Sequence, residues 1–464
     1  MTIHHWSPSR PPPPMPARSG VTDTCNAAQA IDRILARFVR YHPDRIDLSL
    51  DRMYRLLSDL GDPHTQLPPV IHVAGTNGKG STVAFLRAAL EASGRTVSSY
   101  TSPHLVRFAE RYRLAGAIPK DIELLSLFEE VEAINAGKAI TEFEITTAAG
   151  LLAISRTHAD IAILEVGLGG RFDATNVIDK PLATVITRIA MDHMGFLGDT
   201  IGAIAAEKAA IQKPGVPSIV GPQEPAALDV ISRTAETNRA VLYRAGVEWS
   251  FTPDENGNGG VYQGPETAWH LPAPALPGRH QLDNAATAAA CLDICNLSGM
   301  DEMTVGEGLR TANWPGRLQR VTDGSLVGML PDTWELWVDA AHNPSGAQAA
   351  AEMFAALMRC DPRPLHLVLA MASDKNTAGV LSAFAGIATS ITTLPINNAP
   401  HMRSPESLAD EARKLGIPSH SADSLGSALE SLASEVLPAR VLITGSHLLV
   451  GAALSINAVA VLDQ

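Results

Sequence analysis

A short apolar run that breaks into a glycine-rich loop constrains the fold more than any other part of this sequence. Residues 70–74, VIHVA, have the β-branched, apolar character of a buried strand, and 75–81, GTNGKGS, follow directly. Helical apolar spacing then continues to Leu90 and closes at Gly94. Strand, glycine loop and helix in this order predict a phosphate cradle, because glycines let backbone N–H groups approach phosphate and the helix N-terminus adds a positive dipole.

Two side chains in this loop suit a nucleotide and its metal ion. Lys79 would neutralise phosphate charge, and the Ser81 hydroxyl would bind Mg²⁺, although Ser81 stands two residues after the lysine and not directly behind it as in the ordinary P-loop. The competing interpretation is a plain glycine-rich turn. We favour nucleotide binding and predict these binding residues: Gly75, Thr76, Asn77, Gly78, Lys79, Gly80 and Ser81.

Strand-like and helix-like segments alternate around the loop. Helical spacing covers much of 22–60, and helices are also expected at 122–134 and 143–155. Parallel strands joined by crossover helices follow from this alternation, with strands expected at 96–100, 161–166, 182–189 and 217–220. Residues 251–265 are expected to form a local hairpin instead.

A second alternating series begins near residue 316. It suffices for a small doubly wound sheet, with strands expected at 336–339, 365–371, 391–396 and 441–444. Pro and Gly interrupt helix formation at 313–316, which marks the boundary. The predicted class is α/β: a P-loop ATPase-type parallel sheet domain at 22–313 and a smaller Rossmann-like domain at 316–464, after a proline-rich tail at 1–21. A ligand cleft is expected between the domains.

The net charge of −13 argues against a nucleic-acid surface, which needs clustered Lys and Arg. Anionic ligands must then meet local positive groups. The four cysteines show no C-x-x-C pair or regular disulfide spacing, which favours a reducing compartment. No apolar run reaches membrane-spanning length, so we expect a soluble, cytoplasmic protein with no nucleic-acid or membrane partner.

Ionisable residues stand at the ends of predicted strands, where the ligands of parallel sheets gather. Glu165 would be a good oxygen ligand for Mg²⁺, and capping of the adjacent loop is an equally good interpretation. Asp192 and His193 end another strand, and Lys208 lies on a helix farther along. Taken alone, a single His is more often structural and a single helical Lys is more often solvated.

Asp339 and His342 follow a strand in the second half of the chain. In a doubly wound sheet this place faces the cleft, so Asp339 could accept hydrogen bonds from ribose hydroxyls and His342 could contact phosphate or substrate. The competing role is helix N-capping. Asn343 before Pro344 suits that role and leaves Asp339 and His342 free.

Taken together, these motifs resemble the folylpolyglutamate synthase and dihydrofolate synthase family, a branch of the ATP-dependent ligases that includes the Mur cell-wall enzymes. The resemblance covers roughly residues 30–455. It rests on many motifs in one order: 72–81 (HVAGTNGKGS), 101–105 (TSPHL), Phe143-Glu144, 164–176 (LEVGLGGRFDATN), Asp192-His193, Glu207-Lys208, 278–284 (GRHQLDN), 315–317 (PGR) and 339–344 (DAAHNP). It implies that ATP phosphorylates a substrate carboxylate and that the amine of glutamate attacks the resulting acyl phosphate.

The resemblance also assigns residues to ATP, metal and catalysis. The adenine and ribose side of ATP would be completed by Asn284, Arg317 and Asp339. Two Mg²⁺ ions are implied, with ligand positions at Ser81, Glu165, His193 and Lys208. Lys208 matches a lysine that becomes carbamylated, which converts a cation into a carboxylate-like ligand. Catalytic roles fall to Lys79, His193, Lys208, Arg317 and His342.

For the acceptor, the resemblance points to Phe143 as a surface on which a pterin stacks and to Asp173 and Ala174 at the polar edge of the ring. A carboxylate can accept paired hydrogen bonds from the amino and ring N–H groups of a pterin. The implied partners are dihydropteroate, reduced folates and L-glutamate, and we expect a monomer. Phe143 together with Asp173 favours an enzyme with both synthase activities.

Three alternatives stay open beside this interpretation. The first is folylpolyglutamate synthase activity alone. The second is a Mur-type ligase that acts on a UDP-sugar peptide, which is disfavoured because only about fifty structured residues precede Gly75, too few for a separate UDP-binding domain. The third is a nucleotide-binding regulator without ligase chemistry, which is disfavoured because all the expected ligand residues are present.

Overall fold

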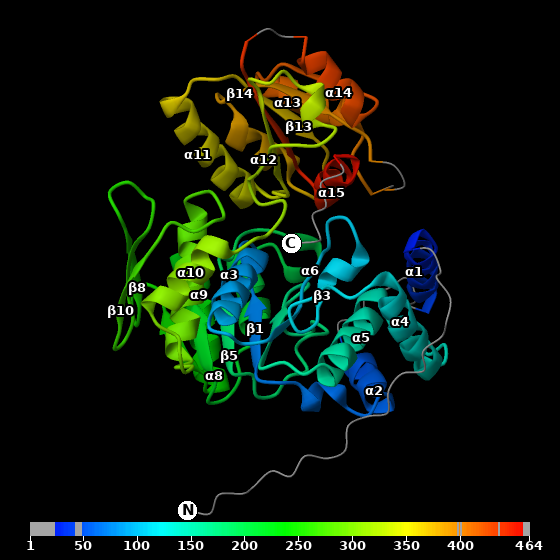
Figure 1. The fold of residues 1–464 in the computed structure, drawn as a ribbon, viewed down its shortest axis with the longest axis vertical. Coiled ribbons are helices and arrows are strands. Elements are labelled where there is room, and N and C mark those ends of the chain that lie inside the picture. The colour runs from blue at the N-terminus through cyan, green and yellow to red at the C-terminus, as the bar shows by residue number, and fades with distance from the viewer. Residues whose placement is uncertain (1–23, 42–48, 397–398, 400, 435–436, 458–464) are drawn as a thin grey trace, which may run out of the picture.

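A computed structural model describes residues 24–41, 49–396, 399, 401–434 and 437–457. The predicted tail at 1–21 lies outside the described residues. Figure 1 shows a larger body that carries the elements from blue to green and a smaller body that carries those from yellow to red. The two bodies meet along one side, where the chain passes from one to the other.

The larger body is built on a seven-stranded sheet that is parallel except at one edge, where β3 runs antiparallel to β2. Its strands in spatial order are β3 (Tyr112–Arg113), β2 (Val97–Tyr100), β4 (Ile161–Glu165), β1 (Val70–Ala74), β5 (Ala183–Ile186), β6 (Pro217–Val220) and β7 (Val241–Arg244). β1 has the bounds that the sequence predicts. It lies in the middle of the sheet, so the loop that follows it opens at the centre of the sheet edge.

Alternate residues of the central strands pack against helices on opposite faces, as the period of two in a strand requires. Ile71 and Val73 of β1 belong to a core shared with α3 (Lys79–Ala92), α9 (His280–Ile294) and α10 (Glu302–Thr311). Val70 belongs to the opposite core, which is shared with α1 (Thr24–Phe38), α2 (Asp51–Asp59), α4 (Asp121–Asn135) and α5 (Glu142–Arg156). Both faces of the sheet are therefore covered.

The remaining elements of this body lie at its margins. Beside β5 and β6 pack α6 (Met194–Leu197), α7 (Ile201–Ala209) and α8 (Pro225–Asn238). The predicted hairpin is present and gains a third strand, so that β8 (Ser250–Pro253), β9 (Gly260–Gln263) and β10 (Ala268–Leu271) form a small antiparallel sheet. Short 3₁₀ helices are η1 (Val39–Tyr41), η2 (Pro63–Gln66) and η3 (Phe108–Arg111).

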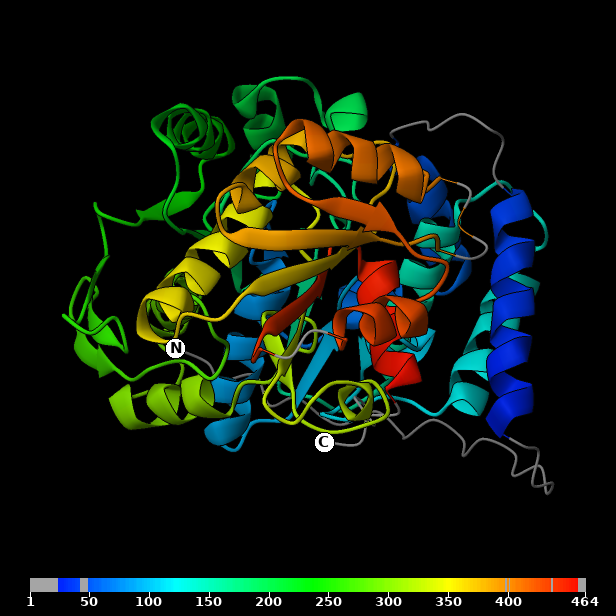
Figure 2. The same cartoon turned by 90° about the horizontal axis from the view of Figure 1, so that it is seen from above.

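The smaller body holds a six-stranded sheet that is parallel except for its first strand. In spatial order its strands are β11 (Gln319–Val321), β12 (Glu335–Asp339), β16 (Arg440–Thr444), β13 (Leu365–Leu369), β14 (Ala388–Thr393) and β15 (Ser419–Ser421). One face packs against α11 (Pro344–Cys360), α12 (Thr377–Phe384) and α13 (Pro405–Lys414). The other packs against η4 (Val327–Met329), α14 (Leu425–Leu432) and α15 (His447–Ile456), and Figure 2 shows this layered arrangement from above.

The two doubly covered, mostly parallel sheets confirm the predicted α/β class. The proposed division at 313–316 stays a prediction, and the two sheets lie on either side of it in the sequence. The two-residue β3 and the three-residue β11 and β15 were not predicted, because such short edge strands leave too little pattern. Over the described stretches of the chain, no helix is long and apolar enough to cross a membrane.

Candidate active site

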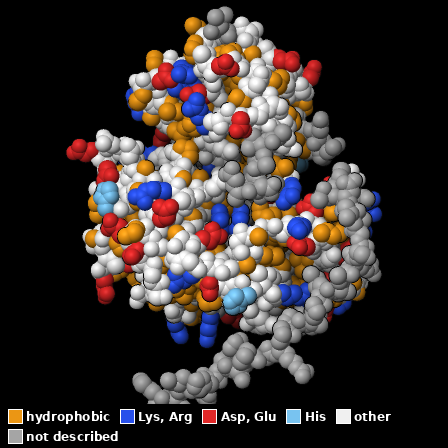
Figure 3. Space-filling view, in the orientation of Figure 1, with side chains coloured by type: hydrophobic (Ala, Val, Ile, Leu, Met, Phe, Trp, Pro, Cys, Tyr) orange, Lys and Arg blue, Asp and Glu red, His pale blue; other side chains and the backbone are white. Residues whose placement is uncertain are grey.

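A cleft of about 1140 Å³ lies where the two bodies meet, and the carboxyl ends of strands from both sheets open into it. Its lining includes the glycine loop at 75–81, the segment at 188–193, the start of α9, and segments 339–346 and 445–448 of the smaller body. Figure 3 shows Lys and Arg side chains beside acidic ones at the waist between the bodies. The cleft is thus where the sequence predicts a ligand between two domains.

The glycine loop fits its place only because its glycines lack side chains. Gly78 adopts a left-handed conformation with φ +86° immediately before α3, and a Cβ there would overlap the side chain of Asn284. A Cβ on Gly80 would come within 2.7 Å of the Trp314 indole. The backbone N–H group of Thr76 donates to the Arg188 carbonyl at 3.0 Å. The loop is therefore held rigid from several sides.

Two lysines converge on this loop from different helices. Lys79 Nζ donates to the carbonyl oxygens of Gly75 at 3.1 Å and Thr76 at 3.3 Å, and Lys208 Nζ donates to the Gly75 carbonyl at 3.0 Å. Lys208 is buried. Burial, reinforced by the positive charge of Lys79, lowers the pKa of Lys208 from 10.5 to about 7. Near neutral pH, the Lys208 amine is therefore held partly in its uncharged form.

Glu165 ends β4 beside the two lysines and is buried. Among the described residues it has no ion-pair partner, and its carboxylate accepts a hydrogen bond from the backbone N–H of Ser102 at 3.3 Å. Burial raises its pKa, and the charges of Lys79 and Arg317 oppose that shift. A buried carboxylate of this kind gains from a cation placed next to it.

The four predicted metal-ligand residues, Ser81, Glu165, His193 and Lys208, all line the cleft. Within the described ranges no group of three or more His, Cys, Asp and Glu residues is arranged to hold a metal by itself. Ser81 and Glu165 offer the oxygen ligands that suit Mg²⁺, which keeps several waters and commonly uses one or two carboxylates together with phosphates of the substrate. The residues therefore fit a magnesium ion that binds together with a nucleotide.

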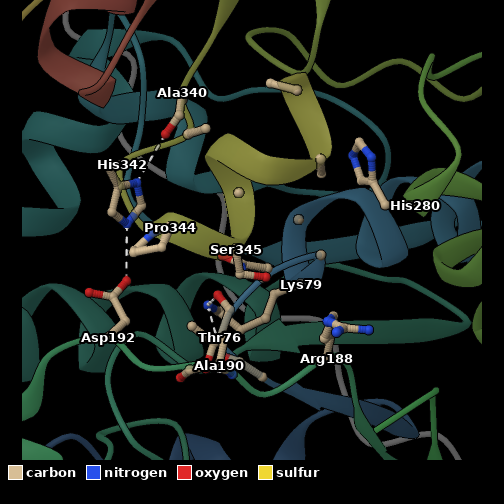
Figure 4. Close-up of a pocket in the computed structure, with 18 of the residues that line it drawn as sticks. Thr76, Lys79, Arg188, Ala190, Asp192, His280, Ala340, His342, Pro344 and Ser345 are labelled. Atoms are coloured by element: carbon tan, nitrogen blue, oxygen red, sulfur yellow. Dashed lines mark hydrogen bonds and ion pairs between the residues drawn. The ribbon is translucent and has the colours of Figure 1, made fainter. Parts of the chain in front are cut away.

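The carboxylate of Asp192, in the larger body, contacts polar and charged side chains of the smaller body. Its carboxylate contacts three side chains of the smaller body: Lys375 Nζ at 2.6 Å, Asn343 Nδ2 at 3.0 Å and His342 Nε2 at 3.3 Å. Figure 4 shows His342 pointing at Asp192 across the cleft. The hydrogen bond and charge of His342, together with the charges of His193 and Lys375, hold the pKa of Asp192 well below its usual range, despite burial. His193, next in the chain, has a pKa lowered to about 4, mainly by burial.

Lys375 is a site residue that the sequence analysis does not predict. It lies in the loop after β13, with 10% of its side chain exposed, and its ammonium also stands 3.4 Å from His193 Nε2. The available signal is positional, because this loop follows the carboxyl end of a parallel strand. His280 at the start of α9 also lines the cleft, and its Nδ1 is buried without a described hydrogen-bond partner.

Asn284, Arg317 and Asp339, predicted on the adenine and ribose side, line the same cleft. Asp339 is buried, and burial raises its pKa. One of its carboxylate oxygens accepts from the Leu318 N–H at 2.8 Å and the other from the Ala341 N–H at 2.9 Å. Because a carboxylate has about four acceptor positions, capacity for a ligand hydroxyl remains.

Phe143, Asp173 and Ala174 stand behind the cleft wall, under a loop whose Gly167 and Leu168 line it. Phe143 packs so closely on this loop that a Cβ on Gly167 would overlap its ring. The carboxylate of Asp173 accepts hydrogen bonds from the N–H groups of Gly167 at 3.0 Å and Leu168 at 2.9 Å, and from both the N–H and the hydroxyl of Thr175. The predicted pterin-binding role of these residues stays a prediction, and the geometry shows Phe143 and Asp173 supporting the loop.

A glycine loop that faces a second α/β domain across a cleft lined by charged side chains fits a two-domain nucleotide-dependent ligase. The sequence matches the Mur ligase middle domain over residues 73–292 and the Mur ligase glutamate ligase domain over residues 316–447. It is 39% identical over 327 residues to the dihydrofolate synthase/folylpolyglutamate synthase of Bacillus subtilis, which covers 65% of this chain and 71% of that protein. The Escherichia coli protein of the same name is 36% identical over 362 residues, covering 77% and 80%.

Solved structures agree with the sequence relatives. The structure of E. coli FolC in complex with DHPP and ADP superposes with a TM-score of 0.81 at 32% identity, covering 93% of this chain and 98% of that one. Mycobacterium tuberculosis folylpolyglutamate synthase complexed with ADP gives a TM-score of 0.82 at 29% identity, covering 94% and 99%. The chain belongs to the dihydrofolate synthase/folylpolyglutamate synthase family, which confirms the resemblance seen in the sequence.

Proposed function

We propose that this ligase uses ATP to join L-glutamate to 7,8-dihydropteroate, forming dihydrofolate, and to reduced folates, extending their glutamate chain. The observation that carries the proposal is the cleft in which Lys79 and Glu165 of one domain face His342 and Lys375 of the other. Two relatives support it by what they bind: E. coli FolC was solved with DHPP and ADP, and a bifunctional relative with Mn, AMPPNP and L-glutamate, at 32% identity and a TM-score of 0.79.

The ATP phosphates are assigned to the loop at 75–81, whose N–H groups and helix dipole favour negative charge. Lys79 would release the loop carbonyls and contact the phosphate, and Arg317 would approach from the opposite domain. Both cations stabilise the charge on a phosphoryl group in transfer to the acceptor carboxylate. Asn284 and Asp339 are assigned to the adenine and ribose side of the same nucleotide.

Two Mg²⁺ ions are assigned to Ser81, Glu165, His193 and Lys208. When bound, such ions supply charge neutralisation along the phosphates. We propose that Lys208 is carbamylated: its uncharged amine adds to CO₂, an N–C bond forms, and one proton is released. The lowered pKa of Lys208 supports this step, because the uncharged amine is the form that reacts. The carbamate would then add a second anionic oxygen ligand beside Glu165.

After phosphoryl transfer, the amine of glutamate attacks the acyl phosphate carbon, an amide bond forms, and inorganic phosphate leaves. Activation is needed because a free carboxylate is a poor electrophile. His342 and Lys375 are proposed to orient the anionic reactants from the C-terminal domain. Their contacts with Asp192 support this proposal, because they hold both side chains at the cleft. Phe143, Asp173 and Ala174 are proposed to shape the pterin pocket through the loop that they support.

The test is ATP- and Mg²⁺-dependent phosphate release by the purified protein with L-glutamate and either 7,8-dihydropteroate or tetrahydrofolate, with products identified by mass. Glutamylated products from both acceptors are expected. Lys79→Met should be inactive, whereas Lys180→Met, a change at an exposed lysine, should behave as wild type. Activity with tetrahydrofolate alone would restrict the enzyme to chain extension, and activity only with a UDP-muramyl substrate would refute the folate assignment.

We further propose a monomer in the cytoplasm, with the domain boundary at 313–316. The cysteine spacing in the sequence shows no disulfide pattern, which supports the cytoplasmic assignment. Sedimentation of the purified protein tests the monomer directly. A sedimenting species of twice the 49.1 kDa chain mass would contradict it.

A further inference from the structure

One loop touches both the proposed metal site and the C-terminal domain. This loop, residues 101–107, follows β2 and is named the docking loop here. At its start the backbone N–H of Ser102 donates to Glu165 at 3.3 Å. Farther along, Leu105 and Val106 pack against the core of the C-terminal domain. The two contacts lie three residues apart in the chain.

The last three residues of the docking loop are braced by one carboxylate. The carboxylate of Glu110, just beyond it, accepts hydrogen bonds from the backbone N–H groups of Leu105 at 2.8 Å, Val106 at 3.0 Å and Arg107 at 2.6 Å. Three charge-assisted hydrogen bonds to successive N–H groups leave that stretch of backbone little freedom. Only two residues separate this braced stretch from Ser102, so the position of Leu105 limits where the Ser102 N–H can lie.

Leu105 packs against two glycines, Gly451 and Gly316, which leave room for it because they lack side chains. Gly451 lies in α15, and a Cβ there would overlap the carbonyl oxygen of Leu105 and come within 2.9 Å of its carbonyl carbon. Gly316, with φ +73°, lies against the Leu105 side chain, so that a Cβ would come within 3.1 Å of Cδ1. The fit depends on an absent side chain at each position.

We propose that the docking loop is a positioning element: docking of α15 on Leu105 sets the Ser102 N–H, and thereby the Glu165 carboxylate, in the orientation that holds Mg²⁺. Groups that orient a metal ligand strongly affect metal affinity, although they never touch the metal. Assembly of the metal site is thus conditional on the C-terminal domain being docked. The inference rests on the proposed function, because the metal role of Glu165 belongs to it.

Gly451→Ala isolates this contact. Alanine is favoured over glycine in a helix by about 1 kcal/mol, so the change does not weaken α15 itself. The atoms that the new methyl would meet belong to the other domain. Gly426→Ala is the matched control, since Gly426 lies in α14 of the same domain and its nearest atom would be Met329 Cε at 3.6 Å.

The measurement is the affinity for Mn²⁺, by electron paramagnetic resonance titration with a non-hydrolysable ATP analogue present, for wild type, Gly451→Ala, Gly426→Ala and Glu165→Gln. Gly451→Ala is expected to bind Mn²⁺ about tenfold more weakly, the lower end of what loss of an orienting group costs. Glu165→Gln, which changes a proposed ligand itself, is expected to bind Mn²⁺ at least as weakly. Gly426→Ala should match wild type. Affinity for ADP without metal should stay unchanged in Gly451→Ala.

Wild-type Mn²⁺ affinity in Gly451→Ala, with weakened binding in Glu165→Gln, would overturn the docking-loop inference alone. Wild-type affinity in Glu165→Gln would instead refute the metal assignment on which both proposals stand. Because Gly451→Ala could prevent folding, Leu105→Ala serves as the second variant. It removes the seated side chain without adding a clash, and it is expected to weaken Mn²⁺ binding in the same direction; wild-type affinity in it would equally overturn the inference.

Discussion

Replacing Lys208 with methionine should make the protein more stable near pH 7 while abolishing its activity. The pKa of Lys208 is about 7 in the folded protein against 10.5 for a free side chain. Between those values the unfolded chain binds a proton that the folded protein does not, so stability falls as the pH falls from 10.5 to 7. At pH 7 this penalty is about 4 kcal/mol.

Methionine removes the penalty and also removes the hydrogen bond from Lys208 to the Gly75 carbonyl. A hydrogen bond from a charged donor contributes about 1.5–3 kcal/mol, so the net gain near pH 7 is about 2 kcal/mol. Near pH 10 the folded-state amine is uncharged, so its hydrogen bond contributes only about 0.5–1.5 kcal/mol, which is comparable to a remaining penalty of below about 1 kcal/mol. Lys208→Met should therefore be more stable than wild type near pH 7 and about as stable as wild type near pH 10.

Urea unfolding in buffers free of CO₂, at both pH values, measures this difference. Lys180→Met, at an exposed lysine, should show no pH-dependent difference from wild type. Added bicarbonate near pH 8 should stabilise the wild type but not Lys208→Met, because only the lysine can form a carbamate. A stability gap of constant size from pH 7 to pH 10 would refute the reasoning.

Three further changes probe the cleft. Asp192→Asn removes the charge that three C-terminal side chains contact, so kcat should fall about 100-fold while calorimetry shows unchanged ATP affinity; an equal loss of ATP affinity would contradict this. Gly80→Ala crowds the Trp314 indole and should weaken binding of an ATP analogue about tenfold, whereas Gly202→Ala, with 3.6 Å of clearance, should not. Asp173→Asn places an amide N–H donor against the backbone N–H groups of Gly167 and Leu168. It should raise KM for dihydropteroate about tenfold and leave KM for ATP unchanged; a matching rise for ATP would count against it.

The glycine loop and its flanking elements could be predicted from the sequence because each local signal agrees with the next. An apolar strand with clear breakers on both sides left no freedom in the bounds of β1. The same logic located Glu165, since an acidic residue that ends a parallel strand meets the ligand edge. These predictions needed only short-range information.

Lys375 and the environment of Asp173 required long-range information. Lys375 reaches the site because β13 and β5 end on opposite walls of one cleft, and no spacing in the sequence encodes that approach. For Asp173, the sequence shows a carboxylate in a glycine-rich loop. It does not show that the loop folds back so that its own N–H groups occupy the oxygens.

The amide of Asn343 has consequences for exchanging domains between relatives. Its oxygen caps α11 through the Gly346 N–H, and its nitrogen donates to Asn77 of the glycine loop at 2.9 Å and to Asp192 at 3.0 Å. A single side chain thus stabilises a helix of one domain and also forms hydrogen bonds across the interface with the other domain. A chimaera must therefore keep three residues together: Asn77, Asp192 and Asn343. Otherwise a foreign domain that folds well alone would lack the matching hydrogen-bond partners at the domain interface.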